Sequence, residues 1–169
     1  MNYEAWANDP LGWGHFVLAL LALASGGLIF LATKGTRFHR IAGYTYVLSM
    51  GLTNVSALLI YDLTKSFNLF HAFALYSLLL LAGAFWGVWR FVRTLEPRHI
   101  AMHANMMAWS WFGLVMAAIA ETVTRLFDDL LLGPGGWTPF LVFLAVSMGI
   151  GSYVTYRLIK RFVPNYFQT

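Results

Sequence analysis

The sequence predicts an all-α integral membrane protein with five transmembrane helices, its N-terminus outside the cytoplasm and its C-terminus inside. Hydrophobic residues make up 59% of the chain and charged residues only 11%, whereas soluble domains carry about 25% charged residues. Five apolar segments are each long enough to cross a bilayer as a helix, which takes roughly 20 residues. Such segments are too long for barrel strands, and lipid permits only helices or closed barrels.

The first two predicted helices cover residues 13–33 and 40–61. The polar turn Lys34-Gly35-Thr36 separates them, and the polar stretch 62–66 ends the second. Glycine and charged residues of this kind are typical of chain reversals between apolar segments. A connection this short makes the two helices antiparallel neighbours.

The remaining three predicted helices cover residues 68–92, 100–124 and 137–159. Pro97 marks the start of the fourth helix, and the Gly-Pro-Gly-Gly run 133–136 separates the fourth from the fifth. We therefore expect a single transmembrane domain over residues 1–169. The first four helices would form its core, and the fifth would be an additional C-terminal helix.

Basic residues give the orientation, because they concentrate on the cytoplasmic side of membrane proteins. Nine lie at alternate helix ends that carry only one acid, Glu96. The opposite ends hold most of the acids. These basic residues are Lys34, Arg37, Arg40, Arg90, Arg93, Arg98, Arg157, Lys160 and Arg161. The net charge of +4 thus reflects membrane topology and not nucleic-acid binding. Since the chain has no cysteine, disulfides, iron–sulfur clusters and thiolate metal sites are excluded.

Four histidines form two predicted levels in the membrane. His15 precedes Lys34 by 19 residues and His71 precedes Arg90 by 19 residues, so both are expected near the outer face. On the two antiparallel helices, His39 precedes Asp62 by 23 residues and His103 precedes Arg125 by 22, near the inner face. Ionisable groups in membrane helices are rare and usually functional.

Paired imidazoles on facing helices are the axial ligands that a low-spin haem needs. Two such pairs predict two b-type haems, stacked so that electrons cross from one face to the other. His15 and His71 would hold the outer haem, and His39 and His103 the inner one. The arginines near the inner pair would bind propionates or an anionic donor, and Glu121 with Arg125 would line an outer substrate or quinone pocket. These arginines are Arg37, Arg40 and Arg98.

A second interpretation uses a different set of histidines. His99 and His103 are four residues apart and face the same side of a helix. With His39 they would form a three-histidine zinc site with an open position, and Glu96 would act as a base. Neighbouring methionines would also suit copper. The chain would then be a metal-dependent membrane enzyme. A third interpretation is a non-catalytic membrane partner or a transporter.

The run from His39 through Gly43 to Tyr46, which reads HRIAGYTY, resembles a family of small bacterial membrane proteins catalogued as a domain of unknown function. His15 before it and the stretch His103-Ala-Asn-Met106 after it extend the resemblance over about four helices. The resemblance implies a multi-pass protein of the bacterial cytoplasmic membrane. It implies no activity.

The layout of the histidines also resembles the dihaem cytochromes b of the ascorbate- and ferric-reductase type. The resemblance implies a membrane oxidoreductase, with a quinol, an ascorbate-like reductant or a ferric chelate as redox partner. Those proteins commonly have six helices, with the haems in the middle four, whereas five are expected here. Expected partners are thus the lipid bilayer, a quinone or other small redox molecule, and a second copy of the chain in a homodimer.

Overall fold

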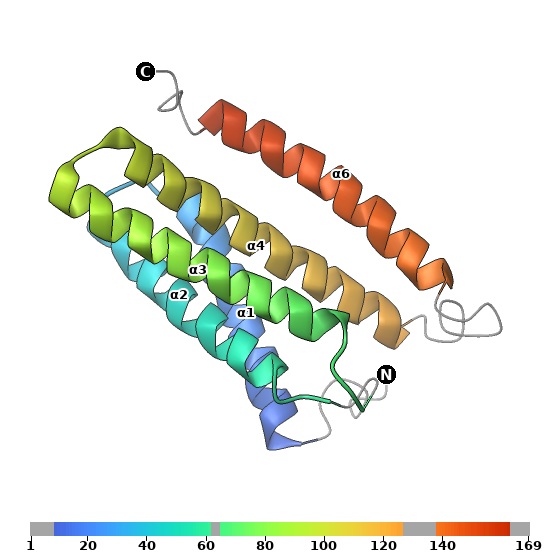
Figure 1. The fold of residues 1–169 in the computed structure, drawn as a ribbon. Coiled ribbons are helices and arrows are strands. Elements are labelled where there is room, and N and C mark those ends of the chain that lie inside the picture. The colour runs from blue at the N-terminus through green and yellow to red at the C-terminus, as the bar shows by residue number, and fades with distance from the viewer. Residues whose placement is uncertain (1–8, 62–64, 127–137, 163–169) are drawn as a thin grey trace. The chain divides into compact units, whose positions relative to one another are not determined.

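The computed structural model describes residues 9–61, 65–126 and 138–162, apart from the side chains of residues 124–126 and 162. Every regular element in these ranges is an α-helix (Figure 1). The prediction of an all-α protein with five helices is confirmed, and the observed ends lie within about one turn of the predicted ones. The helices are α1 (Pro10–Leu31), α2 (Arg37–Ala57), α3 (Leu69–Thr94), α4 (Pro97–Leu126) and α6 (Thr138–Phe162).

Four of the described helices, α1, α3, α4 and α6, are long and apolar enough to cross a membrane. The chain is therefore an integral membrane protein, as predicted. α2 does not meet the same standard. Its 21 residues span about 31 Å, which is sufficient length at 1.5 Å per residue, but its composition is less apolar than that of the other four. The difference from the sequence prediction is explained by polar side chains that α2 buries.

Local sequence signals begin the first two helices. Asp9 accepts a hydrogen bond from the backbone N–H of Gly12 (2.7 Å), and Pro10 opens α1. Thr36 caps α2 by accepting from the backbone N–H of His39 (3.2 Å). Asp and Thr are preferred caps because their side-chain oxygens satisfy amides that have no partner within the helix. These caps fix where the first two helices begin.

Lys34 closes the end of α1. Its amine donates hydrogen bonds to the carbonyl oxygens of Ile29 (2.5 Å) and Phe30 (3.3 Å). A cation at this end also interacts favourably with the helix dipole. Burial lowers the pKa of Lys34 from its ordinary value of 10.5, because loss of water disfavours the charged amine.

The chain divides into two compact units. Unit 1, Met1–Leu81, contains α1, α2 and the first half of α3, and unit 2, Ala82–Thr169, contains the second half of α3 with α4 and α6. Each unit is described by itself below.

In unit 1, α1 and α2 pack along one another. Ala22, Ser25 and Gly26 bury the facing side of α1, and small residues of this kind let membrane helices approach closely. The buried side of α2 is rich in hydroxyl and amide groups, namely Tyr46, Ser49, Thr53, Asn54 and Ser56.

The buried polar groups of α2 find hydrogen-bond partners within the protein, mostly backbone carbonyls of α2 itself. Ser49 donates to the carbonyl oxygen of Thr45 (2.7 Å), and Thr53 donates to that of Ser49 (2.8 Å). Asn54 donates both to the carbonyl oxygen of Met50 (2.9 Å) and to Ser77 Oγ on α3 (3.1 Å). Their burial therefore leaves few unmet hydrogen bonds, which are costly in lipid.

In unit 2, α3 and α4 cross closely at Gly87. A Cβ atom at this position would lie 2.8 Å from the carbonyl oxygen of His99 and 3.0 Å from the backbone nitrogen of His103. α6 runs alongside α4 (Figure 1), with Gly151 against the side chains of Phe112 and Met116. Glycine at both crossings allows the helix axes to come together.

Candidate functional site

His15 lies on α1 and reaches across to α2. Its Nδ1 atom is 3.2 Å from the carbonyl oxygen of Thr53 and 2.9 Å from Ser56 Oγ. A carbonyl oxygen only accepts, so its contact assigns the ring proton to Nδ1. The Nε2 atom then carries the lone pair. Metal-bound histidines often have this tautomer, with Nε2 bound to the metal and the Nδ1 hydrogen donated to a neighbouring acceptor.

His71 lies in the first turn of α3 and is 1% exposed. Its ring contacts those of Tyr61 (4.5 Å between centroids, tilted by 39°) and Phe67 (5.2 Å, tilted by 33°). The Nδ1 atom accepts a hydrogen bond from the backbone N–H of Asn68 (3.2 Å), so the proton belongs on Nε2. This buried Nε2 atom has no hydrogen-bond partner among the described residues.

His15 and His71 lie at the same end of unit 1. His15 contacts Ser56 in the last turn of α2, and the ring of His71 contacts that of Tyr61 just after that helix ends. α1 and α3, which do not follow one another directly in the chain, thus each bring one imidazole to the end of α2. The role of the pair as iron ligands stays a prediction.

His103 lies on α4 and contacts α3 in unit 2. Its Nδ1 atom is 3.0 Å from the carbonyl oxygen of Ala84. As for His15, the carbonyl acceptor assigns the proton to Nδ1 and leaves the lone pair on Nε2. The close crossing at Gly87, one turn further along α3, brings the two backbones near enough for this contact.

His39, the predicted partner of His103, lies in the first turn of α2 in unit 1 and is half-buried. The two histidines belong to different units. The pairing of His39 with His103 stays a prediction.

Glu96 and two neighbours form an ion cluster where α4 begins. Glu96 Oε2 lies 2.5 Å from Arg98 Nε and 3.5 Å from His99 Nε2. The carboxylate of Glu96, which the zinc interpretation assigns as a base, is therefore already in contact with Arg98 and His99. No group of three or more His, Cys, Asp or Glu side chains within the described ranges could hold a metal ion. The zinc or copper site on His39, His99 and His103 therefore gains no support.

Three arginines among the remaining predicted site residues are exposed. Arg37 and Arg40 are exposed in the first turn of α2, and Arg98 pairs with Glu96. Glu121 is half-buried on α4. The side chain of Arg125, its predicted partner, lies outside the described residues.

Gly87 is a residue that sequence reasoning missed. The signal was present as Gly83-Ala-Phe-Trp-Gly87, since glycines four residues apart mark close crossings of membrane helices. At Gly83 an added Cβ would meet the flexible side chain of Met106, whereas at Gly87 it would meet the α4 backbone. Of the two glycines, only Gly87 thus faces an obstacle that cannot rotate away.

Three of the four histidines can be compared with what haem iron requires, and one of them is an exception. His15 and His103 have the tautomer that would bind iron through Nε2. The Nε2 atom of His71, which has no hydrogen-bond partner among the described residues, belongs to a ring beside those of Tyr61 and Phe67. The exception is the proton on that atom, which His71 must give up before it can bind a metal.

Comparison with known proteins gives the family of this chain. The family model described as a predicted membrane protein (DUF2306) matches residues 12–146, which include the HRIAGYTY run and all four candidate haem ligands. No curated protein matches the chain, and no solved structure does. The resemblance to a membrane family of unknown function is confirmed. With its match over most of its length, the chain belongs to the DUF2306 family of predicted membrane proteins.

Proposed function

We propose that this protein transfers electrons across the membrane by means of two b-type haems. His15 and His71 are the ligands of the outer haem, and His39 and His103 those of the inner one. Haem iron, when bound, supplies reversible one-electron transfer. The proposal rests on one observation: a member of each predicted pair donates its Nδ1 hydrogen to a backbone carbonyl, His15 to Thr53 and His103 to Ala84.

The two carbonyl contacts hold the imidazoles ready for a metal. Each fixes the ring orientation, keeps the proton on Nδ1 and makes Nε2 a better donor. Neither ring has to be charged, which matters because a charged ligand is costly to bury in a membrane. His15 and His103 therefore need no proton transfer before they bind iron.

His71 must change more than the other ligands. With Nδ1 accepting from Asn68, the Nε2 atom bears the proton. Binding through Nε2 requires that the proton leave, or that the ring turn and give up the contact with Asn68. The aromatic rings of Tyr61 and Phe67 lie beside it, with centroids 4.5 Å and 5.2 Å away.

Exposed arginines supply the polar contacts at the inner level. Arg37 and Arg40 flank His39 in the first turn of α2, and guanidinium groups bind carboxylates with two parallel hydrogen bonds. They would anchor propionates or an anionic redox partner. At the outer level a quinol, an ascorbate-like reductant or a ferric chelate would exchange electrons, with Glu121 and Arg125 in its pocket.

The absorption spectrum of the purified protein tests the proposal. Protein made in haem-replete cells should show sharp reduced bands typical of a b-type cytochrome. His15→Ala and His71→Ala should each lose one haem and keep the other. His99→Ala is the matched control and should keep both. A colourless wild-type protein, or unchanged haem content in both His15→Ala and His71→Ala, would overturn the assignment.

A further inference from the structure

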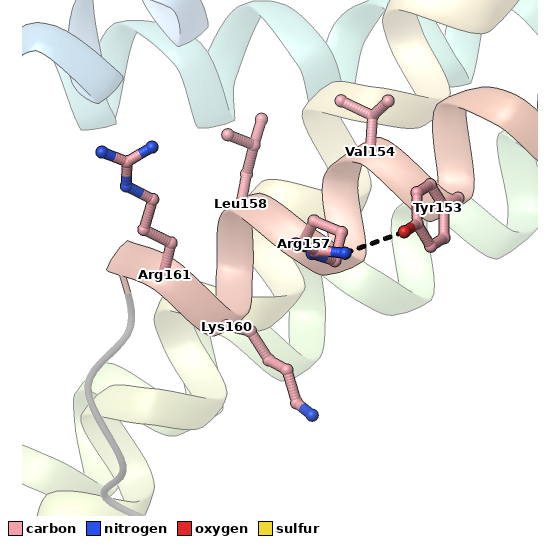
Figure 2. Close-up of a pocket in the computed structure, with 6 residues that line it drawn as sticks. All are labelled: Tyr153, Val154, Arg157, Leu158, Lys160 and Arg161. Atoms are coloured by element: carbon pink, nitrogen blue, oxygen red, sulfur yellow. Dashed lines mark hydrogen bonds between the residues drawn. The ribbon is translucent and has the colours of Figure 1, made fainter.

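The last three turns of α6 carry a concentrated positive charge beside aromatic rings. The helix has no acidic residue over its 25 residues. Its end forms a hollow lined by Tyr153, Val154, Arg157, Leu158, Lys160 and Arg161 (Figure 2). This combination of cations, phenols and aliphatic side chains is not used by the proposed electron transfer.

Arg157 lies at the centre of this surface and is held by Tyr153. Its Nη1 atom donates to the Tyr153 hydroxyl (2.8 Å), and its Cζ atom lies 5.7 Å from the tyrosine ring centroid. Figure 2 shows Leu158 and Lys160 pointing to opposite sides of Arg157. Arginine has five N–H donors, so its contact with Tyr153 leaves donors for a ligand.

Lys160 is placed in a similar way by the second tyrosine. Its Nζ atom lies 5.2 Å from the ring centroid of Tyr156, within the range of a cation–π attraction. Such an attraction holds the amine without neutralising it. Tyr153 and Tyr156 are 60% and 48% exposed, so both cation–aromatic pairs lie at the surface of the helix.

In the part of unit 2 that the structure describes, Glu96 is already paired, because its carboxylate lies 2.5 Å from Arg98 Nε.

We propose that the C-terminal end of α6 binds the phosphate group of an anionic phospholipid. Arg157 and Lys160 bind the phosphate oxygens, and the Tyr153 hydroxyl, which accepts from Arg157, donates its own hydrogen to the same group. Val154 and Leu158, about half exposed, contact the acyl chains next to it. Tyrosine and basic residues together are typical of the headgroup level of a bilayer. This inference is independent of the proposed electron transfer.

Lipid binding to the full-length protein in neutral detergent tests the proposal. Phosphatidylglycerol and phosphatidylcholine are added separately, and bound lipid is counted by native mass spectrometry. The wild-type protein should prefer phosphatidylglycerol. Arg157→Gln combined with Lys160→Gln should weaken that preference about 30-fold, since each basic residue near an anionic surface contributes about 1 kcal/mol.

Two further variants separate a built site from general charge attraction. Arg90→Gln combined with Arg93→Gln removes two charges, also three residues apart, from the same predicted membrane face and should keep the preference. Tyr153→Phe keeps every charge and should weaken binding about threefold, as expected for loss of one hydrogen bond. Equal losses in the two double variants, no preference in the wild type, or full competition by inorganic phosphate at the lipid concentration would each overturn the proposal.

Discussion

The Nδ1 atom of His103 on α4 lies 3.0 Å from the carbonyl oxygen of Ala84 on α3. This contact joins two helices of unit 2 and also sets the tautomer of the imidazole. The same side chain therefore has a structural role, as a hydrogen-bond donor, and a proposed role as a metal ligand. Substitutions can separate the two roles.

We expect His103→Gln to lose one haem and to keep the stability of the fold. The glutamine amide can still donate to the carbonyl of Ala84, but it is a poor iron ligand. His103→Ala removes both functions and should also lower the free energy of unfolding by about 1 kcal/mol, the usual net value of one hydrogen bond. Reduced-minus-oxidised spectra and thermal unfolding in detergent measure the two effects. If His103→Gln keeps two haems, His103 is not a ligand.

Gly87→Ala should destabilise the protein by about 1–3 kcal/mol, the usual cost of overpacking. The new methyl group would lie 2.8 Å from the carbonyl oxygen of His99 and 3.0 Å from the backbone nitrogen of His103. Backbone atoms cannot rotate away, so α3 and α4 must separate. The midpoint of thermal unfolding in detergent checks this expectation.

Gly113→Ala is the matched control for that substitution. It lies on α4, and an added Cβ there would meet nothing within 4 Å. Because alanine is favoured over glycine in a helix by about 1 kcal/mol, Gly113→Ala should leave stability unchanged or raise it. Similar losses of stability for both variants would contradict a specific role for the close crossing at Gly87.

A double-mutant cycle on Asn54 and Ser77 should give a coupling free energy of about 0.6 kcal/mol, the average for hydrogen bonds between membrane helices. The bond between Asn54 Nδ2 and Ser77 Oγ (3.1 Å) joins α2 to α3 in unit 1. The variants are Asn54→Ala, Ser77→Ala and both together, measured by unfolding in mixed micelles. The control is the same cycle with Thr122→Ala in place of Ser77→Ala. The Thr122 hydroxyl donates within its own helix, so this cycle should give no coupling.

Lys34 predicts a rise in stability at high pH. Its pKa in the folded protein is below the ordinary value of 10.5, so the folded state binds fewer protons than the unfolded state between those two values. Stability therefore increases as pH rises through that interval. Lys34→Gln should remove this part of the increase, and Arg37→Gln, which leaves Lys34 in place, should keep it. Identical pH profiles for Lys34→Gln and wild type would contradict the assignment.

Helix positions were predictable because their ends carry strong local signals. Pro97 was predicted to mark the start of the fourth helix, and α4 begins there. For α1 and α2 the apolar pattern predicts starts at residues 13 and 40, three residues after the observed ones, because it does not register the caps Asp9 and Thr36. The end of α2 was less predictable. The sequence predicts a helix to Tyr61, whereas α2 ends at Ala57. Residues 58–61 continue the apolar run, so hydropathy does not indicate that the helix ends at Ala57.

The partners of the histidines could not be predicted. Spacing along the chain indicates the depth of His15 and His103, but the carbonyl groups of Thr53 and Ala84 that they meet depend on how two helices pack. The ring contacts of His71 with Tyr61 and Phe67 likewise join residues of a connecting segment to a helix. Contacts of this kind are set by tertiary packing and not by the local pattern.

The polar side of α2 has a consequence for biosynthesis. Membrane insertion of a nascent helix depends on its own apolarity, and α2 is the described helix that does not reach the level expected of an independent span. α1 is strongly apolar and packs along it, after a reversal at Gly35 (φ 79°). We expect α1 and α2 to leave the translocation machinery together as a helical hairpin, with the hydroxyl groups of α2 already shielded before lipid surrounds them.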